Sequence, residues 1–144
     1  MARPSSAGIV GFMDYKFCSN SQDIVAGLME RKLCTSFRQI GKTTGLATMV
    51  HLKYMGGAPV TVILHANNML DYFKDICDEV IRNNELFRTL RPANLTVISQ
   101  YQEQRVAQAF RSDNPIYVDE FELLNEALRF RLLQSKNFRG ATGA

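Results

Sequence analysis

The tripeptide Gly41-Lys42-Thr43 lies where the chain passes from a short apolar segment, residues 33–37, into a helical pattern. That context is typical of a phosphate-binding loop, in which backbone N–H groups at a helix N-terminus face the phosphates. Gly41 would let the backbone approach the ligand, Lys42 would neutralise the β- and γ-phosphate oxygens, and Thr43 would offer its hydroxyl to Mg²⁺. The tripeptide therefore predicts a nucleotide site, with a capped helix and a surface lysine as the structural alternative.

A second pair of residues that could take part in catalysis, Asp119-Glu120, follows the apolar run 116–118. In α/β sheets ligands bind at the carboxyl ends of the strands, so this pair would face a ligand. The aspartate could hold the shell of a Mg²⁺ ion, and the glutamate could polarise an attacking water. The alternative is that both acids cap the following helix, whose N-terminus favours negative charge. The order of the two motifs, with two β-α units between them, favours a P-loop domain that binds a nucleoside triphosphate.

The segments that must position these residues alternate between strand and helix patterns. An irregular lead-in over residues 1–20 precedes a core over residues 21–144, and Ser21 is the expected N-cap of the first helix. The expected helices are 22–32, the segment from the Gly-Lys-Thr motif to Gly56, 68–83 with a continuation toward residue 90, and 123–134; the expected strands are 33–37, 60–65, 95–99 and 115–120. The polar segment 100–114 should hold one or two helical turns. This alternation predicts a three-layer α/β/α fold around a mostly parallel sheet.

Composition narrows the class of protein. The chain has 144 residues, of which 46% are hydrophobic and 22% charged, as in an ordinary globular domain. Its net charge of +3 does not by itself indicate that the protein binds nucleic acid. Three scattered cysteines fit a reducing compartment, and two histidines make a histidine-built metal site improbable. No apolar run reaches the roughly 18 residues that a membrane span needs.

Residues 37–44, which read Phe-Arg-Gln-Ile-Gly-Lys-Thr-Thr, resemble the Walker A motif of large terminase subunits, the ATPases that drive DNA into tailed-phage heads. That family commonly reads Ser-Arg-Gln-hydrophobic-Gly-Lys-Thr-Thr, so Phe37 departs from it. Ser36 stands where the general P-loop pattern has its first glycine, and the absence of this glycine is normal in the terminase family. The resemblance extends to the helix near Gln22 and to the segments 60–65, 106–112, 117–120 and 135–143, the last being similar to the approach to the family's coupling motif.

The resemblance implies a P-loop NTPase core of the type that has an additional strand and a catalytic glutamate. Glu120 would activate water, and Arg38 would act in cis on the γ-phosphate, with pairing to a carboxylate or a DNA phosphate as the alternative for this arginine. Thr43 and Asp119 would hold Mg²⁺. The residues implied to bind ATP are Gln22 at the adenine, Gln39 as a loop-structuring residue, Gly41, Lys42, Thr43 and Thr44.

The function that the resemblance implies is that of a viral DNA-packaging motor, which couples hydrolysis of Mg-ATP to translocation of double-stranded DNA. Such a motor would be a homo-oligomeric ring in the cytoplasm of the host cell, with a portal or nuclease partner and no membrane. The family's nuclease domain has no counterpart here, and the coupling motif is abbreviated to Ala141-Thr142-Gly143. The core is therefore expected to be truncated or to rely on a partner. Whether it hydrolyses ATP by itself is left open.

Two alternatives belong to other functional classes. One is a helicase-like or other DNA-stimulated P-loop ATPase, and the other is a nucleotide-binding regulatory subunit without turnover. Basic residues are candidates for contacts with DNA phosphates, with solvated helix faces as the alternative; they are Arg82, Arg88, Arg91, Arg105, Arg111, Arg129, Arg131, Lys136 and Arg139. His51, within a helix of core residues, is expected to be structural.

Overall fold

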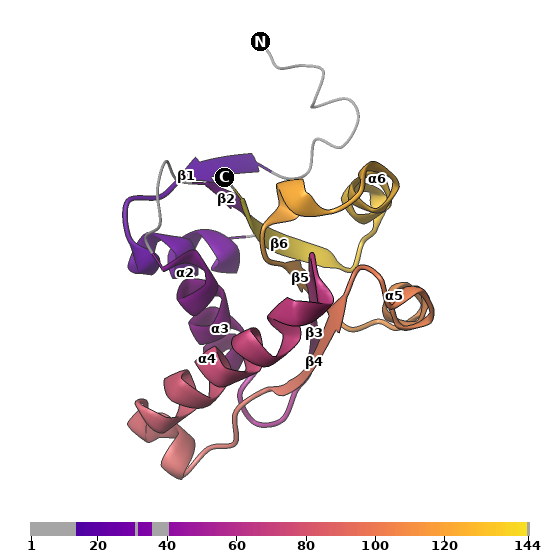
Figure 1. Ribbon diagram of the computed structural model, residues 1–144. Coiled ribbons are helices and arrows are strands. Elements are labelled where there is room, and N and C mark those ends of the chain that lie inside the picture. The colour runs from indigo at the N-terminus through magenta and orange to yellow at the C-terminus, as the bar shows by residue number, and fades with distance from the viewer. Residues whose placement is uncertain (1–13, 31, 36–40, 144) are drawn as a thin grey trace.

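Six parallel strands form a single sheet in the computed structural model, which describes residues 14–30, 32–35 and 41–143 (Figure 1). In sheet order they are β1 (Asp14–Phe17), β2 (Lys32–Thr35), β6 (Phe138–Gly143), β5 (Ile116–Val118), β3 (Pro59–Leu64) and β4 (Asn94–Ser99). Every neighbouring pair is parallel. The last strand in the sequence, β6, therefore lies inside the sheet, between β2 and β5.

Helices cover both faces of this sheet (Figure 1). One face carries α2 (Ser21–Met29), α3 (Lys42–Lys53) and α4 (Leu70–Arg82), and the other carries α5 (Glu103–Arg111) and α6 (Glu126–Gln134). Three single-turn 3₁₀ helices complete the described part: η1 (Asn67–Met69), η2 (Glu85–Arg88) and η3 (Phe121–Leu123). The predicted three-layer α/β/α fold with a parallel sheet is thus confirmed.

The strand β3 shows why its sequence is almost continuously apolar. Val62 and Leu64 pack into the core under α2, α3 and α4, whereas Ile63 packs into the core under α5 and α6. All three are at most 1% exposed. Because both faces of a parallel sheet are covered by helices, its strands lack the alternation of apolar and polar residues seen in half-exposed sheets.

Several element boundaries differ from the sequence-based expectations. The cap of α2 is Asn20 rather than Ser21, because the Asn20 side-chain oxygen accepts a hydrogen bond from Asp23 N at 2.9 Å. The expected irregular lead-in contains β1 at its end. The helix expected to run from 68 toward 90 stops at Arg82, and η2 follows as a separate turn that Asn84 caps.

The polar segment 100–114 contains more helix than the one or two turns that were expected, since α5 covers nine residues. Its buried face is narrow, with Val106 and Ala109 as its buried members. A helix that buries so few side chains has a weak apolar signal in the sequence. The described helices include none with the length and apolar character that crossing a bilayer would require.

His51 is a buried polar residue in the core between α3 and α4. It is 3% exposed, and neither ring nitrogen has a hydrogen-bond partner among the described residues. Its ring lies edge-on to Phe87, with the centroids 6.3 Å apart. Burial lowers the pKa of His51 from its usual 6.5, and the nearby Asp78 carboxylate opposes this shift only in part. The placement agrees with the structural role expected for this histidine.

The depressed pKa of His51 predicts an acid sensitivity of the fold. The unfolded chain takes up a proton near pH 6.5 that the folded chain resists, so the contribution of neutral His51 to stability is full above that pH and is lost as the pH falls below it. We expect His51→Leu to raise the free energy of unfolding by about 1 kcal/mol, because it removes unpaired buried polar atoms. The gain should be larger at pH 5.5 than at pH 8 in chemical denaturation, and parallel pH profiles for the two proteins would contradict this account.

Candidate functional site

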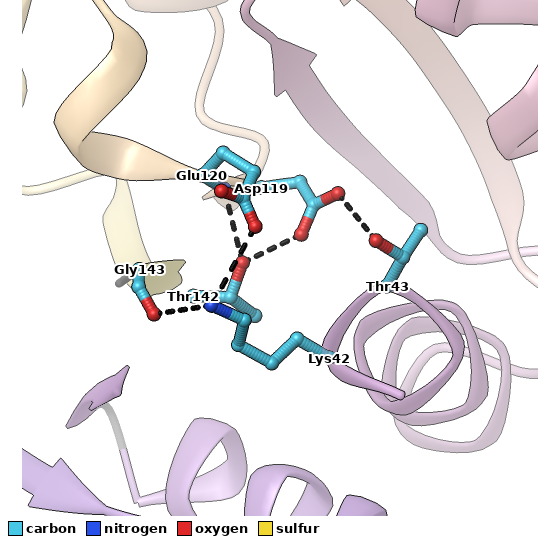
Figure 2. A network of polar contacts seen from close by, with 6 residues as sticks. All are labelled: Lys42, Thr43, Asp119, Glu120, Thr142 and Gly143. Carbon is cyan, nitrogen blue, oxygen red and sulfur yellow. Dashed lines mark hydrogen bonds and ion pairs between the residues drawn. The ribbon is translucent and has the colours of Figure 1, made fainter. Parts of the chain in front are cut away.

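The predicted phosphate-binding and acidic residues meet at the carboxyl edge of the sheet (Figure 2). Lys42 and Thr43 begin α3, and Asp119 and Glu120 directly follow β5. The end of β6 lies between them, because β6 pairs with β2 on one side and β5 on the other. Residues more than 75 positions apart in the sequence are therefore joined by direct contacts.

Asp119 is held by two hydroxyl groups. The Thr43 hydroxyl donates to one carboxylate oxygen at 2.8 Å, and the Thr142 hydroxyl donates to the other at 2.5 Å. The carboxylate is almost completely enclosed, with 1% of the residue exposed. Charge-assisted hydrogen bonds of this kind are shorter and stronger than neutral ones, so they fix the orientation of the group.

Lys42 links the start of α3 to the other two elements. Its ammonium donates to the Gly143 carbonyl oxygen at 2.7 Å and lies 3.6 Å from a carboxylate oxygen of Glu120. Its side chain is 11% exposed. The ammonium thus sits among oxygen atoms at the strand ends, where a phosphate would offer it more negative charge.

Glu120 has an unusual backbone conformation, with φ 60° and ψ 60°, and it is the one non-glycine residue with positive φ in the part of the chain that the structure describes. L-residues avoid this left-handed region, so the conformation needs support from its surroundings. The support includes Thr142, whose hydroxyl oxygen accepts a hydrogen bond from the Glu120 N–H at 3.0 Å. The same hydroxyl therefore orients both members of the acidic pair.

Burial dominates the electrostatics of the acidic pair. Desolvation raises the pKa of the Asp119 carboxyl above its usual 3.8, while hydrogen bonds from Thr142 and Thr43 and the charge of Lys42 lower it. Desolvation likewise raises the pKa of Glu120, with Lys42 opposing the shift and Asp119 adding to it. The two carboxylates have one ammonium beside them, so an added cation would reduce the electrostatic repulsion between them.

The other predicted ligand residues are placed less closely. Gly41 has φ 79°, a left-handed conformation that glycine adopts readily at the start of α3. Thr44 is exposed, and the structure shows its carbonyl, but not its hydroxyl, in a hydrogen bond. Gln22 is exposed in the first turn of α2, and no described contact links its side chain to the network. Arg38 and Gln39 lie outside the described residues.

Close packing of α2 and α3 still places the first turn of α2 beside this site. A side-chain carbon at Gly45 would lie 2.8 Å from Ile24 Cγ2 and 3.2 Å from the Ser21 carbonyl oxygen, closer than carbon atoms tolerate. A side-chain carbon at Gly41 would lie 3.6 Å from Ser21 Cβ. Gly45 therefore allows the two helices to approach each other where both begin.

Gln100, which the sequence did not single out, organises the loop after the acidic pair. It is 7% exposed, and its amide nitrogen donates to the carbonyl oxygens of His65 at 2.8 Å and Leu123 at 3.2 Å. Its amide oxygen accepts from the Asn125 N–H at 2.8 Å, and Asn125 in turn caps α6. A glutamine directly after an apolar strand is the signal that could have indicated this role.

The residues present fit Mg²⁺ and a phosphate chain. Mg²⁺ prefers oxygen ligands and is commonly held by one or two protein oxygens together with phosphates and water. The Thr43 hydroxyl and the Asp119 carboxylate, 2.8 Å apart, are such a pair, and Lys42 lies next to them. The described residues contain no group of three or more His, Cys, Asp and Glu that would hold a metal without a ligand's help.

The raised pKa of Asp119 predicts that this residue costs stability. The folded chain holds the proton more tightly than the unfolded chain does, so the contribution of Asp119 to stability is most favourable at low pH and is lost as the pH rises beyond 3.8 and through the raised pKa. We expect Asp119→Asn to stabilise the ligand-free chain at pH 7, on the order of 1 kcal/mol, since a neutral amide removes the buried charge. The amide nitrogen can face Thr43, whose hydroxyl rotates to accept.

Chemical denaturation between pH 4 and pH 8 would measure this effect, and the gain should shrink toward pH 4. The matched control is Asp75→Asn, which changes an exposed carboxylate on α4 and should leave stability nearly unchanged. A less stable Asp119→Asn protein over the whole range would contradict the prediction.

Comparison with known proteins returned no match: no protein-family model, no curated protein and no solved structure matches the chain. A functional assignment therefore depends on the fold and on the contacts at the carboxyl edge of the sheet.

Proposed function

We propose that this chain is the ATPase core of a DNA-packaging motor of the terminase type, which binds Mg-ATP and hydrolyses it. The observation that carries the nucleotide-binding part is the contact of Thr43 with Asp119 next to Lys42 and Glu120. Hydroxyl, ammonium and two carboxylates are the groups that phosphoryl transfer needs, gathered at one helix N-terminus.

The strand order supports this proposal. One strand, β6, separates β2, which leads toward the Gly-Lys-Thr motif, from β5, which ends at the acidic pair. Neighbouring strands lie about 4.8 Å apart, so β2 and β5 are roughly 10 Å apart. That spacing leaves room for a phosphoryl group between α3 and Glu120, and it agrees with the additional strand that the resemblance to terminases implied.

The residues then have separate tasks. Lys42 exchanges the Gly143 carbonyl and the Glu120 carboxylate for phosphate oxygens, and Thr43 and Asp119 would hold Mg²⁺. The bound ion supplies charge neutralisation at the phosphates. Glu120, freed from Lys42, accepts a hydrogen bond from the attacking water and orients it toward the γ-phosphate. Burial raises the pKa of Glu120, which makes its carboxylate a better proton acceptor.

Two substitutions test binding and turnover separately. Lys42→Ala should weaken ATP binding by about a hundredfold or more, because it removes the cation of the site. Glu120→Gln should retain ATP binding within a few-fold and lower turnover by about a hundredfold or more, because the amide cannot accept the proton. Equilibrium binding of a fluorescent ATP analogue and steady-state phosphate release measure the two quantities.

Two surface substitutions serve as matched controls: Lys74→Ala on α4 and Glu126→Gln on α6 change exposed residues. Both should bind and hydrolyse ATP like the parent protein. Unchanged ATP binding and hydrolysis in Lys42→Ala and Glu120→Gln would overturn the proposed function. ATP binding without measurable hydrolysis by the parent chain would favour a nucleotide-binding regulatory subunit.

The mechanical part of the proposal depends on the resemblance of residues 37–44 and 117–120 to terminases. It includes a homo-oligomeric ring, a portal or nuclease partner, double-stranded DNA as the moving substrate and the host cytoplasm as the location. Added duplex DNA should raise the steady-state ATPase rate several-fold, and the effect should weaken with salt because phosphate contacts release counterions. A rate raised by single strands but not by duplex DNA would favour the helicase-like alternative.

A further inference from the structure

A second candidate site lies on the other face of the sheet, away from the Asp119 network. A pocket of about 320 Å³, open to the solvent, lies between α5, the edge strand β4 and its neighbour β3. Thr61 of β3 and Thr96 of β4 form a register pair in its wall. Both precede the carboxyl ends of their strands by three residues, so the pocket is set back from the carboxyl edge.

The wall is unusually polar for this face of the sheet. Farther along the same two strands, Ile63 and Ile98 fill the core under α5 and α6, and Ile98 also borders the pocket, whereas Thr61 and Thr96 bring hydroxyl groups to it. Helix α5 and the loop after it add further hydrogen-bonding side chains. The polar side chains that line the pocket and form no side-chain hydrogen bond with the described part of the chain are Thr61, Thr96, Arg105, Gln108 and Asn114.

Thr61 is the most informative of these residues. It is 5% exposed, and among the described residues its hydroxyl has no hydrogen-bond partner. Among the described residues, the fully buried side-chain polar atoms without a partner are the two ring nitrogens of His51, so the Thr61 hydroxyl is accessible from the pocket and free to bind a water or a ligand. By contrast, the Ser112 hydroxyl in the same wall donates to the Ala109 carbonyl at 2.9 Å. The Thr61 hydroxyl is thus available to a ligand, whereas that of Ser112 is already bonded.

The charge of the wall selects a class of ligand. Arg105 is its one charged residue among those described, and no acidic side chain lines it. A guanidinium presents a planar set of donors that fits a carboxylate or a phosphate. The amides of Gln108 and Asn114 and the two threonine hydroxyls can each donate and accept. A volume of 320 Å³ lies at the small end of the range of about 300–1,000 Å³ seen for ligand pockets.

We propose that this pocket binds a small organic anion, in which a carboxylate or phosphate pairs with Arg105 and further polar groups reach Thr61, Gln108 and Asn114. The proposal does not depend on the ATPase assignment, because none of its residues belongs to the network around Asp119.

The test uses amide chemical shifts of the full chain in the presence of three probes. Glycerol 3-phosphate supplies a phosphate, succinate supplies carboxylates, and glycerol is the uncharged match of the first. We expect saturable shifts at the amides of Thr61, Arg105 and Asn114 with at least one anion and none with glycerol. Shifts confined to Gly41 and Lys42 would report the other site and would overturn the proposal.

Substitutions separate specific binding from general attraction of anions. Arg105→Gln should weaken binding of the anion by about tenfold or more. Arg111→Gln removes an exposed arginine of the same helix that does not line the pocket, and it should change the affinity less than twofold. Equal losses in the two variants, or none in Arg105→Gln, would overturn the proposal.

Thr61→Val gives an independent readout, since valine has the same shape as threonine without the hydroxyl. This variant should melt no lower than the parent in the absence of anion, because no protein group loses a hydrogen bond to the hydroxyl. It should also bind the anion several-fold more weakly. A lower melting temperature would show that the protein itself satisfies the hydroxyl and would contradict the inference.

Discussion

The enclosed carboxylate of Asp119 is the group on which the carboxyl edge of the sheet depends. Its two oxygens accept hydrogen bonds from α3 and from β6, so one side chain joins three elements that are distant in the sequence. A buried charge costs free energy unless such partners surround it. The two threonine hydroxyls reduce this cost only in part, because the pKa of Asp119 is still raised. The remaining cost would be offset by a cation bound next to it.

Small residues make these close approaches possible. Gly45 lets α2 contact α3, and Gly143 at the end of β6 leaves room for the Glu122 side chain. A side-chain carbon at Gly143 would lie 3.1 Å from a carboxylate oxygen of Glu122. The left-handed backbone of Glu120 is a local strain that the Thr142 hydroxyl helps to maintain. Strain and buried charge at one place are typical of functional sites, where stability is traded for chemistry.

The opposite face of the sheet also holds polar groups that could bind a ligand, although their chemistry differs. There the Thr61 hydroxyl, which has no hydrogen bond to another described residue, lines a pocket that also presents Arg105. His51, between α3 and α4, is also unpaired, but it lies in a core and faces the ring of Phe87. The first arrangement opens to a pocket and suits a ligand. The second is enclosed by apolar packing and affects only the stability of the fold.

The sequence by itself determined the α/β class, because the apolar periodicity of a strand or a helix is local and can be recognised within about ten residues. It also determined the Gly-Lys-Thr and Asp-Glu motifs, whose position between a strand and a helix can be recognised without knowing their partners. Only the tertiary structure decided that β6, rich in glycine and small residues, pairs between β2 and β5, and that Gln100 ties the loop after Glu120. The pairing of distant segments depends on the packing of the whole chain, which no local pattern records.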